Sequence, residues 1–200
     1  ACGSTTMQDN TFAAKENKDF TKYTNQLVVE YAENDYTTMH QFFEHPEDYG
    51  IDVNKVDISL GEFYTDNTKE IKEDQKELKK FNRSTLDKTQ QTIYDELKYE
   101  NELSLKAENK KFQYLNNCWS TMSGLHQSLI SVFSEYILRN EQDIKDLITL
   151  INDVPRYTND ILEYTKEQAD KNTLQFDYDS VTQDIQDVIN NKEDSSITSA

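Results

Sequence analysis

The 200-residue sequence predicts an all-α fold, an array of about seven amphipathic helices. Its four glycines and two prolines are too few for a β-sandwich or barrel, which needs a turn about every ten residues. Apolar residues recur at spacings of three, four and seven along several segments, which is the period of one helix face. Twelve tyrosines, nine phenylalanines and one tryptophan indicate a packed core rather than an unfolded acidic chain.

The first two helices are predicted before Pro46. Helical periodicity starts at Thr11, and a second, short helix covers residues 36–44. That helix should stop at His45, because a residue that precedes proline avoids the α-helical region.

Residues 46–64 interrupt the helices with one irregular or short extended segment. Val56, Ile58 and Leu60 alternate with other residues over five positions, which is the period of an extended chain. We expect this segment to lie on the helices rather than to form a sheet.

The remaining helices are predicted from residues that favour the first turn of a helix. The expected starts are at Thr65, at Ser84, at Asn140 with Asp143, at Pro155, and at a capping box over residues 180–183. Residues 112–124 have no helical period and end in a turn signal.

The charge of the chain excludes some partners. Acidic side chains outnumber basic ones by 38 to 21, a net charge of −17. Nucleic acid is therefore not expected as a partner, since binding to it depends on Lys and Arg at phosphates. Anionic membrane surfaces are disfavoured as docking sites for the same reason. No apolar run approaches the length of a membrane-spanning helix, about 18 residues or more.

The first residues resemble the cleavage region of bacterial lipoproteins. Ala1 precedes Cys2, and a polar stretch of Gly, Ser and Thr follows. The resemblance implies that Cys2 carries a lipid, that residues 1–10 form a tether, and that the protein is extracytoplasmic and anchored to the cell membrane through this lipid alone. The alternative is that Cys2 is an ordinary residue near a chain end.

No metal site or catalytic centre is predicted from the residues themselves. His40 and His45 are five positions apart, which rotates them by about 140° around a helix, so we interpret them as a surface pair at a helix end. His126 has no acidic neighbour in sequence and is interpreted as an ordinary polar residue. Cys118, in an aromatic stretch, is interpreted as a small buried apolar residue. No cofactor is therefore expected in this chain.

Several motifs together resemble a bacterial family grouped as domain of unknown function 885. They include Pro-Glu-x-Tyr-Gly after a short helix at residues 46–50, and Leu-x-x-x-Gln-x-x-x-Tyr at residues 86–94. The most specific segments are residues 122–129, 135–146 and 153–157. The resemblance extends over roughly residues 25–190.

That family is similar to helical zinc metallopeptidases of the thimet-oligopeptidase and carboxypeptidase Taq kind. Full-length members are expected to be nearly three times as long, with a zinc-binding His-Glu-x-x-His helix in the later half. This sequence has no His-Glu-x-x-His, so no catalytic residue carries over. The resemblance implies that residues 11–200 are the N-terminal helical domain of a longer protein, cut before the catalytic half. Zinc is expected only in that missing C-terminal half.

A candidate interface with the missing half lies in the aperiodic segment. It combines aromatic, apolar and turn residues: Phe112, Tyr114, Trp119, Met122, Gly124 and Leu125. Such a segment is either packed under neighbouring helices or kept for a partner. We expect part of it, with the face that carries Leu125 and Leu129, to meet the catalytic half.

Two functions remain open from the sequence. The first is a non-catalytic N-terminal helical domain of a cell-surface zinc-metallopeptidase-like lipoprotein, which shapes the substrate channel. Its partners would be the protein's own catalytic half and a peptide substrate. The alternative is a free-standing helical lipoprotein that binds a ligand or partner at the cell surface.

Overall fold

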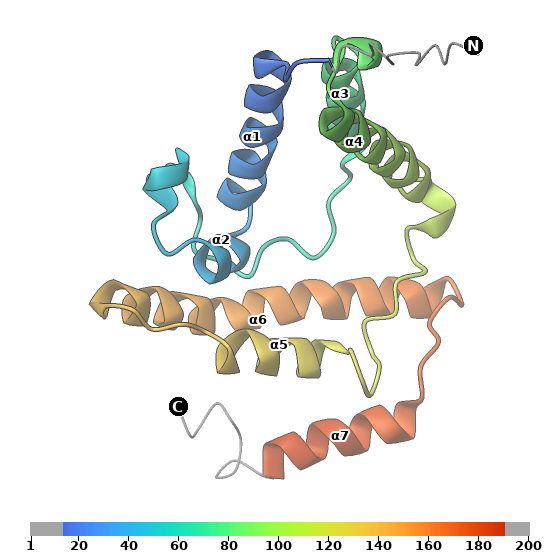
Figure 1. Ribbon diagram of the computed structural model, residues 1–200. Helices are drawn as coiled ribbons and strands as arrows, with labels where there is room; N and C mark the ends of the chain where they lie inside the picture. The colour runs from blue at the N-terminus through green and yellow to red at the C-terminus, as the bar shows by residue number, and fades with distance from the viewer. Residues whose placement is uncertain (1–13, 191–200) are drawn as a thin grey trace, which may run out of the picture. The chain divides into compact units, whose positions relative to one another are not determined.

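The computed structural model describes residues 14–190, and within them the fold is all-α, as predicted (Figure 1). The described residues form seven α-helices and no strand: α1 (Lys18–Glu33), α2 (Tyr36–Phe42), α3 (Thr68–Leu78), α4 (Lys88–Ala107), α5 (Leu125–Ser134), α6 (Glu141–Asp170) and α7 (Tyr178–Asn190). None of the described helices has the length and apolar character needed to cross a membrane. The predicted tether over residues 1–10 and its Cys2 lie outside the described residues.

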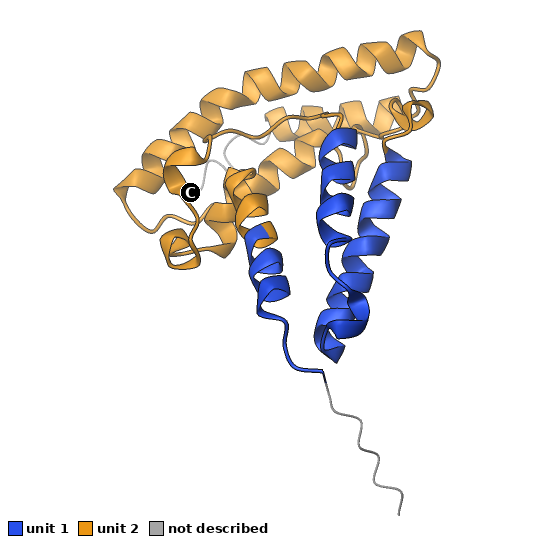
Figure 2. Ribbon diagram, turned by 90° about the horizontal axis from the view of Figure 1, so that it is seen from above, with its two compact units in different colours: residues 1–26, 67–107 blue, residues 27–66, 108–200 orange. Residues whose placement is uncertain are grey.

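The chain divides into two compact units (Figure 2). Unit 1 contains the described residues up to Gln26 together with Asn67–Ala107. Unit 2 contains Leu27–Asp66 and the described residues from Glu108 onward. The helix α1 therefore contributes its first turns to unit 1 and its last turns to unit 2.

Unit 1 is a helical hairpin, α3 and α4, with the first turns of α1. Its core holds Phe20, Leu78 and Leu86, and the ring of Phe20 meets Phe81 edge-on at 5.1 Å between centroids. The buried side chain of Gln90 makes two hydrogen bonds with the backbone of Asn17, at 2.9 and 2.8 Å, and so satisfies both ends of its amide.

Unit 2 is built along α6, a helix of 30 residues that is about 45 Å long. The predicted N-cap at Asn140 is confirmed: its side chain accepts hydrogen bonds from the backbone of Gln142 and Asp143, and with the side chain of Asp143 it forms a capping box. The prediction that Pro155 begins a separate helix is wrong, because Pro155 lies inside α6. Proline in a helix interior costs about 3 kcal/mol. Here Leu150 and Ile161 are fully buried on either side of it, and their packing holds both halves in one helix.

The segment 46–64 is irregular, as predicted, and contains two short 3-10 helices, Pro46–Tyr49 and Val53–Lys55. Its later part is fastened to α6. The backbone N–H of Leu60 donates to Asp153 at 2.8 Å, and Arg156 donates to the carbonyl of Gly61 at 2.8 Å. Arg156 also forms a two-pronged ion pair with Asp153, at 2.6 and 2.8 Å, which holds the pKa of the Asp153 carboxyl below its ordinary value.

Four predicted helix starts are displaced, and in three of them, α1, α4 and α7, a different side chain from the predicted one provides the cap. Periodicity was expected to begin at Thr11, but α1 begins at Lys18 after Asn17, and the helix expected from Thr65 begins at Thr68. The helix expected from Ser84 begins at Lys88, where Asp87 accepts from the N–H of Gln90. Asp177, rather than Ser180, caps α7: it accepts from both the backbone and the hydroxyl of Ser180.

Candidate functional site

Residues 110–124 form an irregular segment of unit 2 that is fastened to α6 by side chains; we refer to it as the 110–124 segment. The hydroxyl of Tyr164 donates to the carbonyl of Gln113 at 2.7 Å and accepts from the N–H of Asn116 at 3.1 Å. The amide of Gln168 donates to the carbonyls of Tyr114 and Asn116, at 3.0 and 2.8 Å. Backbone N–H and C=O groups of this irregular segment, which have no partner in a helix or strand, are thus hydrogen-bonded by two residues one turn apart on α6.

The middle of the segment packs on the same stretch of α6. The indole N–H of Trp119 donates to the hydroxyl of Thr165 at 2.8 Å. Cys118 is buried with Leu125, Ile161 and Tyr164, which confirms its interpretation as a small apolar residue. Burial raises the pKa of the Cys118 thiol to about 11, so it stays protonated at neutral pH and is no nucleophile there.

A tight turn ends the segment and requires glycine. The N–H of Gly124 donates to the carbonyl of Ser120 at 2.8 Å. A Cβ added at Gly124 would lie 2.6 Å from that oxygen and 2.7 Å from the Ser120 nitrogen, both backbone atoms. The close approach of two backbone stretches therefore excludes a side chain at Gly124, and it leaves Met122 at the tip of the turn, 90% exposed.

The predicted interface residues divide into two sets. Leu125 and Gly124 are buried, Tyr114 and Trp119 are half-buried, and Phe112 and Met122 are exposed. Leu115, which the prediction did not include as an interface residue, is also exposed. The segment is thus packed on α6 through residues such as Cys118 and Trp119, while Phe112, Leu115 and Met122 are exposed at separate points along it. Its role as an interface with another part of the protein stays a prediction.

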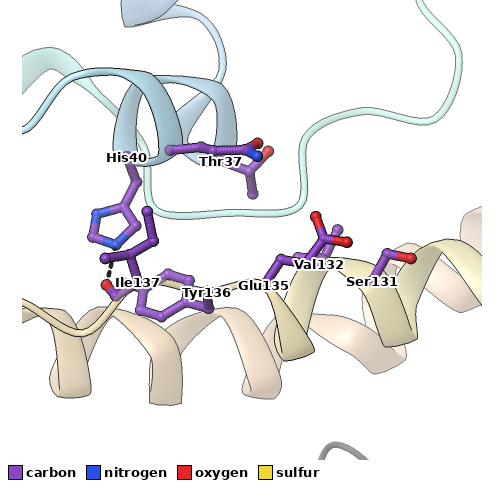
Figure 3. A pocket seen from close by; sticks show the side chains of 8 residues that line it. Thr37, His40, Ser131, Val132, Glu135, Tyr136 and Ile137 are labelled. Carbon is purple, nitrogen blue, oxygen red and sulfur yellow. Dashed lines mark hydrogen bonds between the residues drawn. The ribbon is translucent and has the colours of Figure 1, made fainter.

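The interpretation of His40 as a surface residue is wrong, because its side chain is buried in unit 2 (Figure 3). Its ring stacks on those of Tyr36 and Tyr136, with centroids 5.6 and 4.3 Å away. Its Nε2 lies 2.7 Å from the carbonyl oxygen of Ile137. Since a carbonyl only accepts, Nε2 carries the hydrogen. His45, by contrast, is exposed.

Asp143 joins His40 to the start of α6. Its Oδ2 accepts from the backbone N–H groups of Arg139 and Asn140, at 2.6 and 3.1 Å, and its Oδ1 lies 3.9 Å from Nδ1 of His40. The guanidinium of Arg139 donates to the carbonyl of His40 at 2.9 Å. We call this group, which connects α2 with the start of α6, the His40 junction; it comprises Tyr36, His40, Tyr136, Arg139 and Asp143.

Two tyrosine hydroxyls complete the His40 junction. Tyr136 donates to the carbonyl of Asp143 at 3.0 Å, so its oxygen accepts from Tyr36 at 2.7 Å. The hydroxyl of Tyr36 also lies 3.2 Å from the carboxylate of Asp146. Burial raises the pKa of Tyr36 well above its ordinary value, and Tyr136 and Asp146 raise it further. Both hydroxyls therefore remain protonated donors at neutral pH.

Cavities lie on both sides of His40. The one in Figure 3, about 140 Å³, is lined by residues of α2 and of the end of α5. The larger, about 370 Å³, is lined by apolar side chains such as Met39, Phe43 and Val56 and by charged ones, of which the carboxylates Glu44, Asp143 and Asp146 outnumber the one cation, Arg139. Its chemistry suits a small ligand with an apolar body and a positive group. The described residues contain no cluster of three or more His, Cys, Asp or Glu side chains that could hold a metal ion.

The interpretation of His126 as an ordinary polar residue needs a correction in one respect. Its side chain is only 8% exposed, and neither ring nitrogen makes a hydrogen bond. The nearest acid is Asp184 of α7, 4.0 Å from Nε2. No sequence signal links positions 126 and 184, so this contact could not be predicted.

The comparisons with known proteins identify a family. Residues 49–199 match the family described as bacterial protein of unknown function (DUF885). No curated protein and no solved structure matches the chain. The match covers most of the chain, including the 110–124 segment, the whole of α6 and the α6 side of the His40 junction. The chain therefore belongs to the DUF885 family of bacterial proteins.

Proposed function

We propose that this chain is the non-catalytic helical domain of a larger, cell-surface, zinc-metallopeptidase-like lipoprotein, and that it helps to shape the substrate channel. Membership of the DUF885 family supports the proposal, together with the resemblance of that family to helical zinc peptidases. In this proposal a catalytic half provides the zinc ion and the His-Glu-x-x-His helix. The lipid on Cys2 holds the protein at the outer face of the membrane.

One observation carries this proposal: the 110–124 segment is held on α6 by hydrogen bonds and yet keeps three apolar side chains exposed. Tyr164, Thr165 and Gln168 hold its backbone and Trp119, while Phe112, Leu115 and Met122 remain exposed. A surface that is ordered before binding loses little conformational entropy when a partner covers it. The segment is therefore suited to pack against the catalytic half and form part of a channel wall.

A binding experiment tests this function. We would express the catalytic half of the parent separately and titrate it with the present chain by calorimetry. The triple variant Phe112→Ser, Leu115→Ser, Met122→Ser should bind at least about tenfold more weakly, since it removes the central apolar contacts. The matched control Tyr99→Ser, Leu103→Ser removes two exposed apolar side chains from α4 and should bind as the wild type does.

Two results would contradict the proposal. One is equal binding by the wild type and the triple variant. The other is a gene whose reading frame ends after codon 200, which would leave no catalytic half to bind.

The second candidate function is a free-standing surface lipoprotein that binds a small ligand. The cavity of about 370 Å³ beside the His40 junction favours it, because carboxylates and apolar side chains line the same space. A ligand with a positive amine and an apolar body fits this lining. The test is a screen of hydrophobic amines by ligand-detected NMR, with Asp146→Asn expected to abolish binding and Asp187→Asn, on α7, expected to preserve it.

A further inference from the structure

The helix α6 carries a second, mainly apolar strip that stays about half exposed in the part of the chain that the structure describes. Ile144, Ile148 and Ile151 are each about half exposed, and Leu162 is 42% exposed. Together with Pro155 and Thr158 they are spaced by four, three, four, three and four residues. At about 100° per residue, these positions stay within an arc of about 80° over about 27 Å of helix. The fully buried face, around Leu150 and Ile161, lies about 100–120° away on the same helix.

The spacing indicates what kind of surface fits the strip. Alternating steps of three and four are those of a seam packed against another helix, since they keep apolar residues in line along two helices that cross at a small angle. A flat or irregular partner would not require this regularity. The strip is therefore a helix-docking surface.

The charges beside the strip indicate which helix docks. Glu141 and Lys145 lie along one flank near the start of α6, and Glu163 and Lys166 lie along the same flank near its end. At each end of the strip, the acidic residue comes before the basic residue in the sequence. When a second copy of α6 packs antiparallel, Glu141 comes opposite Lys166 of that copy, and Lys145 comes opposite Glu163.

The same register aligns the apolar residues. An antiparallel pair centred on residue 153 places Ile144 opposite Leu162, Ile148 opposite Thr158, and Ile151 opposite Pro155. A two-fold axis across an antiparallel pair brings like flanks together, so all four ion pairs of the dimer form at once. In a parallel pair this charged flank would instead meet the side of α6 that its own core covers. The four charges would then have no partner on the second copy, and Glu163 and Lys166 would keep only the ion pair that they form with each other at 2.6 Å.

We propose that the chain forms a two-fold symmetric dimer in which the exposed strip of α6 packs antiparallel on the same strip of a second copy. The strip contains no residue of the 110–124 segment. The dimer and the proposed function are therefore tested independently, and the failure of one does not contradict the other. One helix pair of this length is a small interface, and the net charge of −17 on each chain opposes association. We therefore expect a dissociation constant in the micromolar range at about 0.15 M salt, where the Debye length is about 8 Å.

Sedimentation equilibrium of the full chain under reducing conditions measures the association. From about 2 to 200 µM, a range that brackets a micromolar dissociation constant, the wild-type mass should rise from 23.4 kDa towards twice that value. Ile148→Asp should remain monomeric throughout. The matched control Leu103→Asp, on α4 and equally exposed at 53%, should dimerise as the wild type does. Circular dichroism confirms that each variant is folded.

A charge exchange tests the antiparallel register. Lys145→Glu and Glu163→Lys should each weaken the dimer at least threefold, and the double variant should restore it to within twofold of the wild type. A wild type that stays monomeric, an Ile148→Asp variant that still dimerises, or a double variant weaker than either single variant would each overturn the proposal.

Discussion

The His40 junction and the 110–124 segment are both fastened to α6, but by different chemistry. The His40 junction uses a carboxylate, a guanidinium and stacked rings; His40 and Asp143 are buried and Arg139 is half-buried. The 110–124 segment is held by neutral side chains, Tyr164, Thr165 and Gln168, which bind backbone groups and an indole. Buried charged groups are costly to disrupt, whereas neutral bonds contribute about 1 kcal/mol each. The comparison predicts a connection that is costly to disrupt at one end of α6 and a weaker one near the other end.

The largest effect is expected at Asp143. Asp143→Ala removes the acceptor for two backbone N–H groups at the start of α6 and the carboxylate beside His40, and should lower the free energy of unfolding by about 2–4 kcal/mol. Urea unfolding measures this loss of stability. Asp146→Ala, which removes bonds to Tyr36 and Gln142 from a less buried position, should cost about 1 kcal/mol or less. Equal losses in the two variants would contradict the special role of Asp143.

Gly124→Ala should have the next largest effect. The new Cβ meets the backbone of Ser120, so the turn must open at a cost of about 1–3 kcal/mol. Thermal unfolding would show the loss. Ser123→Ala, in the same turn at an exposed position, should change the stability little. A stable Gly124→Ala variant would mean that the turn is not held as tightly as its distances indicate.

Tyr164→Phe tests the neutral connection itself. It keeps the ring but removes the hydroxyl that bridges Gln113 and Asn116, and should cost about 1–2 kcal/mol. Hydrogen exchange at the Asn116 amide should accelerate while exchange in α2 stays unchanged. Tyr157→Phe is the control, because the hydroxyl of Tyr157 makes no hydrogen bond with the described residues. Faster hydrogen exchange in Tyr164→Phe both at Asn116 and in α2 would mean that the 110–124 segment and the His40 junction are not independent connections to α6.

The smallest effect concerns alkaline pH. Because the pKa of Tyr36 is raised in the folded protein, its stabilising contribution is present below the unfolded pKa of about 10 and is lost as the pH rises above it. Between about pH 9 and 11, Tyr36→Phe should therefore lose less stability than the wild type. Tyr164→Phe should change this pH dependence less, since no acidic side chain is bonded to that hydroxyl. A steeper fall in the free energy of unfolding with pH in Tyr36→Phe than in the wild type would contradict the inference that the pKa of Tyr36 is raised in the folded protein.

The parts of the fold that depend on local sequence could be predicted. Apolar periodicity is sufficient for the all-α class, and the N-cap at Asn140 with Asp143 in the first turn involves only residues three apart. The exceptions arise from tertiary packing. Pro155 indicates a helix start in sequence, yet burial of Leu150 and Ile161 on the same face keeps α6 continuous.

The candidate sites were predictable only in part. Lack of periodicity identified residues 112–124, which are most of the 110–124 segment. Tyr164 and Gln168, however, follow the apolar stripe of α6 and give no sign that they bind backbone groups. His40 is buried because Tyr136 and Ile137, nearly 100 residues later, fold over it. Contacts over that separation leave no pattern in a single sequence.

Oxidation of Met122 tests the central claim most directly, namely that another part of the protein covers the exposed side of the 110–124 segment. Met122 is 90% exposed and Met39 is 5% exposed, so Met39 is an internal reference. In dilute hydrogen peroxide, mass spectrometry should show rapid oxidation of Met122 in the present chain. In the parent protein that contains the catalytic half, we predict oxidation of Met122 at least about tenfold slower, close to the rate of Met39. Equal rates of Met122 oxidation in the two proteins would contradict the claim.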